Sequence, residues 1–112
     1  MAALGRLTRR AEFLRTAAKG RKAAATGLVL QALSREDQGP VRLGFTVTKR
    51  IGNAVIRNRT RRRLKEAARL VLAAQPVAGV DLVLIGRERT AQRDFGALQD
   101  DVRRALAKAG VA

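Results

Sequence analysis

The chain has 112 residues, with 24 lysines and arginines against nine acids and a formal charge of +15. This excess predicts a polyanionic partner, because a small domain tolerates such self-repulsion mainly when a polyanion neutralises it. The sequence contains no cysteine and no histidine, which excludes disulfides, thiolate and imidazole metal sites, cysteine nucleophiles and the usual general base. Most enzyme classes are thereby excluded.

The N-terminal half predicts one helix and two strands within a single domain spanning 1–112. A basic tail over 1–8 leads to a helix from Arg9 to Ala18, with Thr8 as its cap and Gly20 as its stop. Residues 21–26 are expected to form a loop or a frayed strand start. Strands are expected over 28–33 and 41–48, and the Asp-, Gly- and Pro-containing turn between them predicts an antiparallel hairpin.

The C-terminal half predicts a helix, a central strand and a last helix. The helix over about 54–74 begins after Asn53 and ends at Gln75 and Pro76. Residues 80–85 are apolar on both faces except for Asp81, which is typical of a central strand covered on both sides. Asp94 then caps a helix whose apolar stripe begins with Phe95. The core is expected to be aliphatic, because phenylalanine is the only aromatic type and occurs three times.

The helix over 54–74 carries the most informative feature of the chain. Between Arg57 and Arg69, seven arginines and lysines stand against one acid, Glu66. Arg57, Arg61 and Lys65 are spaced by four and repel one another along one row, whereas solvated helices usually mix signs at this spacing. The opposite side is expected to be dry and to carry Ile56, Thr60, Leu64, Ala67, Ala68, Val71 and Leu72. Guanidinium groups match phosphate oxygens bidentately, so this helix predicts a nucleic-acid backbone as partner.

The segment from Gly44 to Arg62, with Arg57, Asn58 and Arg59 at its centre, resembles the signature of the bacterial ribonuclease P protein subunit. The likeness extends over nearly the whole chain. It implies a two-layer α/β sandwich in the order α-β-β-β-α-β-α, with a left-handed β-α-β crossover against the general rule. It also implies an accessory protein of an endoribonuclease that removes the 5′ leader of precursor tRNA.

The resemblance implies that the protein binds ribonuclease P RNA and precursor tRNA, and that Mg²⁺ held by the RNA performs the hydrolysis. No catalytic residue, no metal site and no cofactor are expected in the protein itself, nor a dedicated small-molecule ligand. The expected RNA-binding residues are Lys49, Arg50, Asn53, Arg57, Asn58, Arg59, Arg61, Arg62, Lys65 and Arg69. The expected leader-binding cleft contains Phe13, Gln31, Arg9 and Arg10. Two positions that are aromatic in many relatives are Ala17 and Gln31 here, so weaker stacking is expected.

Three other functions would share some of these features. A small structural RNA-binding protein, such as a ribosomal component, shares the charge and size. A DNA-binding regulator would need a short helix-turn-helix partner, which the sequence lacks. A free-standing nuclease would need a general base or metal ligands, and Asp81, Asp94, Asp100 and Asp101 are expected at a strand edge, a cap and a helix surface instead. No apolar run reaches the roughly 20 residues of a membrane span, so no membrane partner and a cytoplasmic location are expected.

Overall fold

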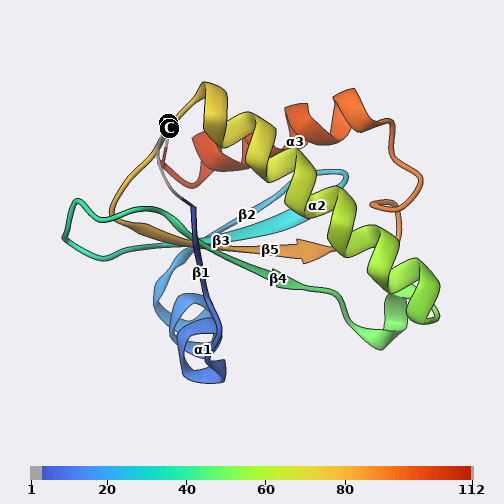
Figure 1. The fold of residues 1–112 in the computed structure, drawn as a ribbon, viewed down its shortest axis with the longest axis horizontal. Coiled ribbons are helices and arrows are strands. Elements are labelled where there is room, and N and C mark those ends of the chain that lie inside the picture. The colour runs from blue at the N-terminus through green and yellow to red at the C-terminus, as the bar shows by residue number, and fades with distance from the viewer. Residues whose placement is uncertain (1–3, 112) are drawn as a thin grey trace.

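A computed structural model describes residues 4–111, which form a five-stranded mixed sheet and three α-helices (Figure 1). The strands are β1 (Gly5–Arg6), β2 (Arg21–Ala24), β3 (Leu28–Ser34), β4 (Arg42–Thr46) and β5 (Val80–Gly86). The helices are α1 (Arg10–Lys19), α2 (Ala54–Ala74) and α3 (Phe95–Lys108), and a 3₁₀ turn η1 (Lys49–Ile51) precedes α2. The expected single α/β domain and its element order are therefore confirmed, with β1 as an additional strand.

The two faces of the sheet carry different helices. Figure 1 shows α2 and α3 side by side on one face, with α1 alone on the other. The interior between the sheet and α2/α3 is aliphatic, as expected. Its fully buried leucines are Leu28, Leu30, Leu64, Leu82, Leu84, Leu98 and Leu106. The strand β5 is buried along nearly its whole length, which confirms the predicted central strand. No helix within 4–111 combines the length and the apolar character that crossing a bilayer requires.

The predicted hairpin between the strands now called β3 and β4 is wrong. The sheet order is β1-β4-β5-β3-β2, so β5 lies between them, parallel to β4 and antiparallel to β3. The central position suits an apolar strand, because helices cover both faces of β5 there, with contacts to α1 on one side and to α2 on the other. The connection after β3 must then span two strand spacings, roughly 10 Å. The side chain of Arg35 holds that connection by donating hydrogen bonds to the carbonyl oxygens of Pro40 and Val80, at 2.8 and 2.9 Å.

Three smaller expectations near the N-terminus are also corrected. Residues 5–6 of the expected basic tail pair with β4 as strand β1, while residues 1–3 lie outside the described part. Residues 21–24, expected as a loop or a frayed start, form β2 at the other edge of the sheet. The cap of α1 is Arg9, not Thr8. The carboxylate of Glu12 accepts the free N–H groups of both residues, at 2.9 and 3.0 Å, and this fixes the start of the helix one residue later.

The unit β4-α2-β5 links two adjacent parallel strands through the basic helix. The left-handed crossover that the resemblance implies for this unit remains a prediction. Figure 1 shows α2 crossing the sheet diagonally on the face that it shares with α3. The helix thus presents one long face to the core and leaves the other uncovered by the described residues.

Candidate nucleic-acid interface

The start of α2 is fixed by local chemistry. Asn53 caps the helix, as predicted, with its side-chain oxygen accepting the N–H of Ile56 at 3.0 Å. Gly52 has φ +153°, a conformation that L side chains rarely adopt. The exposed cations Lys49 and Arg50 lie in the 3₁₀ turn just before it. Cations and free helix N–H groups therefore share one end of α2, which is favourable for phosphate.

The outer face of α2 carries the predicted cationic residues with almost no acid beside them. Among the salt bridges found within residues 4–111, only Arg69 of these cations takes part, at 2.5 Å from Glu66. Arg57 donates to the carbonyl oxygen of Gly52 at 3.0 Å, and Arg61 to the side-chain oxygen of Asn58 at 3.2 Å. Arg59, Arg62 and Lys65 are exposed along the same helix. Most of the guanidinium N–H groups on this face remain available to an external anion.

The buried side of α2 contains the predicted residues except in the first turn of the helix. Thr60, Leu64, Ala67, Ala68, Val71 and Leu72 are buried. Ile56, expected on that side, lies in the first turn and remains 39% exposed.

Arg63 belongs to the basic run by sequence but not by contact. Its guanidinium donates to the carbonyl oxygens of Thr90, at 2.5 Å, and Arg93, and lies 5.9 Å from the ring centre of Phe95. Burial lowers the pKa of this guanidinium, and the neighbouring charge of Arg59 adds to the effect. Arg63 therefore fastens α2 to the segment before α3, and spacing alone did not separate it from its neighbours.

The residues expected to bind the leader gather under α1, with one exception. A cleft of about 510 Å³ is lined by Phe13, Gln31, Arg10 and Ala17, together with apolar residues of β5. Phe13 is half-buried, and Gln31 reaches the cleft from β3. Arg9 is exposed at the helix start and does not line the cleft. The only aromatic ring lining this cleft is that of Phe13.

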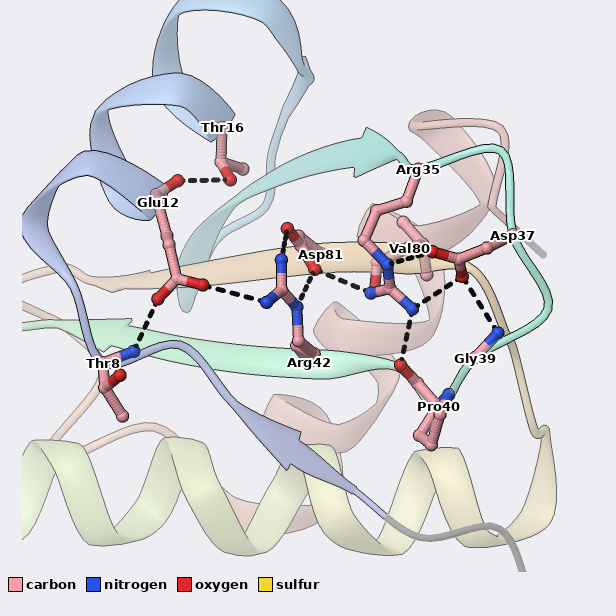
Figure 2. A network of polar contacts seen from close by, with 10 residues as sticks. All are labelled: Thr8, Glu12, Thr16, Arg35, Asp37, Gly39, Pro40, Arg42, Val80 and Asp81. Atoms are coloured by element: carbon pink, nitrogen blue, oxygen red, sulfur yellow. Dashed lines mark hydrogen bonds and ion pairs between the residues drawn. The ribbon is translucent and has the colours of Figure 1, made fainter.

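A buried ion-pair network holds α1 against the sheet (Figure 2). Asp81 is fully buried on central β5, not at a strand edge as expected. It accepts from Arg42 at 2.8 and 2.7 Å and from Arg35 at 2.7 Å. Arg42 also donates to Glu12 of α1 at 2.9 Å. Burial opposes ionisation, but the arginine hydrogen bonds outweigh it and hold the pKa of Asp81 below its usual value.

Asp101 repeats this arrangement on α3, where a helix-surface position was expected. It is fully buried and accepts from the N–H of Gly27 at 3.0 Å, from Arg93 at 2.8 Å, and from Arg104. Burial again opposes ionisation, and the arginines lower the pKa of its carboxyl nonetheless. Asp94 caps α3 as predicted, at 3.0 Å from the N–H of Ala97. Residues 4–111 contain no cluster of three or more carboxylates that could hold a metal ion.

A second groove, which the sequence did not reveal, lies between α2 and the β1–β4 edge. Its volume is about 700 Å³, and Arg61, Arg62 and Lys65 line it together with Phe45. Phe45 is partly buried and packs against the core from the α2 side of β4. The only available signal was the alternation of β4, which places Phe45 and α2 on one face.

Known proteins resemble this chain over nearly its full length. The family model for ribonuclease P matches residues 1–110. The ribonuclease P protein component of Gluconacetobacter diazotrophicus is 63% identical over 106 residues, covering 95% of this chain and 91% of the relative. That of Paramagnetospirillum magneticum is 48% identical, covering 97% and 85%.

Solved structures agree with these relatives. The RNase P protein of Staphylococcus aureus superposes with a TM-score of 0.78 at 27% identity, covering 95% of each chain. That of Thermotoga maritima, at 23% identity and a TM-score of 0.71, shares the fold. These matches favour the ribonuclease P assignment over a small ribosomal component. The chain belongs to the ribonuclease P protein family, the protein component of an endoribonuclease that matures tRNA 5′ ends and whose RNA is catalytic.

Proposed function

We propose that the protein docks onto ribonuclease P RNA through the outer face of α2. The observation that carries this proposal is the row of cations on α2, which the described carboxylates leave unpaired except at Arg69. Arg57, Arg61 and Lys65 follow one another at intervals of four residues, a rise of about 6 Å along the helix. A polyphosphate backbone relieves their mutual repulsion, and the bound counterions that it releases favour association. Lys49, Arg50 and Asn53 extend the same surface to the helix start.

The cleft under α1 is proposed to receive the 5′ leader of precursor tRNA. Phe13 supplies one stacking surface there, Gln31 a hydrogen-bonding amide, and Arg10 a charge for the backbone. With Ala17 beside Phe13, leader binding relies on one aromatic ring and on electrostatic attraction. Arg9 is proposed to contact leader phosphates from the rim outside the cleft.

The chemistry of cleavage is proposed to belong to the RNA partner. Mg²⁺ ions bound by the RNA would activate water for attack at the scissile phosphate, while the protein positions substrate and RNA. No catalytic residue, protein-bound cofactor or dedicated small-molecule ligand is assigned to this chain. The assembled particle is proposed to act in the cytoplasm.

The proposal is tested by the salt dependence of RNA binding. The double variant Arg61→Ala/Arg62→Ala is expected to flatten the slope of log affinity against log salt by roughly 1.4 to 1.8, at about 0.7 to 0.9 per lost phosphate contact. The control Arg103→Ala/Lys108→Ala removes the same charge from the exposed side of α3. An unchanged slope in the first variant, or equal changes in both, would exclude α2 as the principal RNA surface.

A functional assay complements the binding measurement. Mixing the protein with a bacterial ribonuclease P RNA at low magnesium is expected to restore 5′ processing of precursor tRNA. The α2 double variant should require more protein for the same rate, whereas the α3 variant should behave like the wild type. Cleavage by protein freed of RNA would overturn the accessory role.

A further inference from the structure

The groove between α2 and the β1–β4 edge combines an apolar floor with a cationic wall. Leu7, Leu43 and Phe45 supply the apolar part from the sheet and the residue after β1. Arg61, Arg62 and Lys65 supply the wall from α2. The groove differs in this from the α1 cleft, whose lining contains a single cation, Arg10. An apolar floor beside several cations suits a ligand with one flat apolar part and one anionic part.

The one acid that lines the groove is already engaged. Glu66 accepts two hydrogen bonds from Arg69, at 2.5 and 3.1 Å, and these lower the pKa of its carboxyl. Arg6 on β1 adds another exposed cation from the opposite side of the groove. The electrostatic potential in the groove is therefore positive, and it favours an anionic ligand over a neutral one.

The groove and the α1 cleft share one residue, Phe13. Its ring lies against Gly44 of β4, where an added Cβ would stand 2.5 Å from ring carbon Cε1 and 2.7 Å from Cζ. Only glycine leaves room for this approach. Phe13 thus lines both depressions at the sheet edge, with Phe45 on the α2 side.

We infer that the α2 groove binds one unstacked nucleotide of single-stranded RNA, with its base on Phe45 and its phosphates on Arg61, Arg62 and Lys65. The inference rests on the proposed function, since it names a nucleotide subsite beside the same helix. A volume of about 700 Å³ is within the usual range of small-molecule sites. Aromatic stacking beside guanidinium groups is how proteins bind single strands without reading their sequence.

Fluorine NMR tests the inference, because the chain has only three phenylalanines and no other aromatic residue. Protein labelled with 4-fluorophenylalanine gives one signal each for Phe13, Phe45 and Phe95. Decauridylate is expected to shift the Phe45 signal, whereas an abasic ribose-phosphate strand of equal length is expected to leave it in place. A Phe45 signal that decauridylate does not move, or that both strands move equally, overturns the inference.

A matched pair of variants measures the contribution of the ring. Phe45→Leu keeps an apolar side chain in the core and is expected to weaken decauridylate binding by at least about fivefold, the lower end of base-aromatic stacking. Phe95→Leu makes the same substitution at the start of α3 and is expected to leave that affinity unchanged. Equal losses in both variants overturn the inference. The salt slope of the Arg61→Ala/Arg62→Ala protein reports separately on α2, so failure of the base site and failure of the RNA surface are distinguishable.

Discussion

Replacing Asp81 by asparagine tests whether the buried ion-pair network holds the fold together. The Asp81 carboxylate is fully buried and accepts three guanidinium hydrogen bonds at 2.7 to 2.8 Å. Asparagine keeps the shape but removes the charge, so Arg35 and Arg42 lose their shared buried counterion and retain only Asp37 and Glu12, respectively. Breaking a buried pair from one side costs ~3–5 kcal/mol. Since Arg35 and Arg42 retain 14% and 31% exposure, water compensates part of this, and we expect a loss of about 3 kcal/mol.

The measurement is the free energy of unfolding in urea at fixed ionic strength, followed by circular dichroism. A loss of about 3 kcal/mol should lower the melting temperature by roughly 12 °C, at about 4 °C per kcal/mol for a domain of this size. Asp100→Asn is the matched control, because Asp100 is 58% exposed and, among residues 4–111, pairs only with Arg103 on the same helix. Such a pair contributes under about 1 kcal/mol. If Asp81→Asn destabilises no more than this control, the network does not have the role assigned to it.

Four further outcomes are expected. Stability should fall in acid, because arginine hydrogen bonds keep the pKa of Asp81 and Asp101 below the ordinary 3.8 despite burial. Their contribution is complete above about pH 4 and is lost as the pH falls through the depressed folded-state values, which acid titration of unfolding measures. Phe13→Ala should weaken binding of precursor tRNA more than of mature tRNA, and equal losses would assign the ring to packing. Asn53→Ala should cost about 1 kcal/mol in urea unfolding through loss of the helix cap. Gly44→Ala should displace the Phe13 ring and weaken leader binding while leaving RNA binding by α2 unchanged in a paired titration.

Local chemistry made α2 predictable from sequence. Its cap at Asn53, its buried stripe and its end at Gln75 each depend on residues within one or two turns. The same holds for Asp94 at the start of α3. The expected leader residues on α1 also came together, because Phe13 and Arg10 are fixed by one short helix. Features set within about five residues were therefore available before any tertiary contact was known.

Strand pairing and the fate of the buried acids depend on distant partners, and here the sequence was misleading. The turn after β3 predicted a hairpin, yet the strand that pairs with both β3 and β4 begins only at Val80. Asp81 lies 39 residues from Arg42 and 46 from Arg35 along the chain. Asp101 accepts a hydrogen bond from the N–H of Gly27, which lies 74 residues away along the chain. A carboxylate on a strand or helix carries no local mark that distinguishes burial with arginines from exposure to water.

The distribution of acids explains why α2 remains open to an external anion. Nine acids face 24 cations in the sequence, and the fully buried ones, Asp81 and Asp101, each engage two arginines. Glu12 adds a further contact to Arg42. On α2 only Glu66 is within reach, and Arg69 occupies it. Buried carboxylates thus hold arginines in or next to the sheet and α3, and backbone carbonyl oxygens hold Arg63. The other arginines of α2, apart from Arg69, have no carboxylate partner among residues 4–111 and are open to neutralisation from outside. A substitution that adds an acid to the outer row, such as Arg61→Glu, should therefore impair RNA binding more than Arg61→Ala without a comparable loss of folding stability.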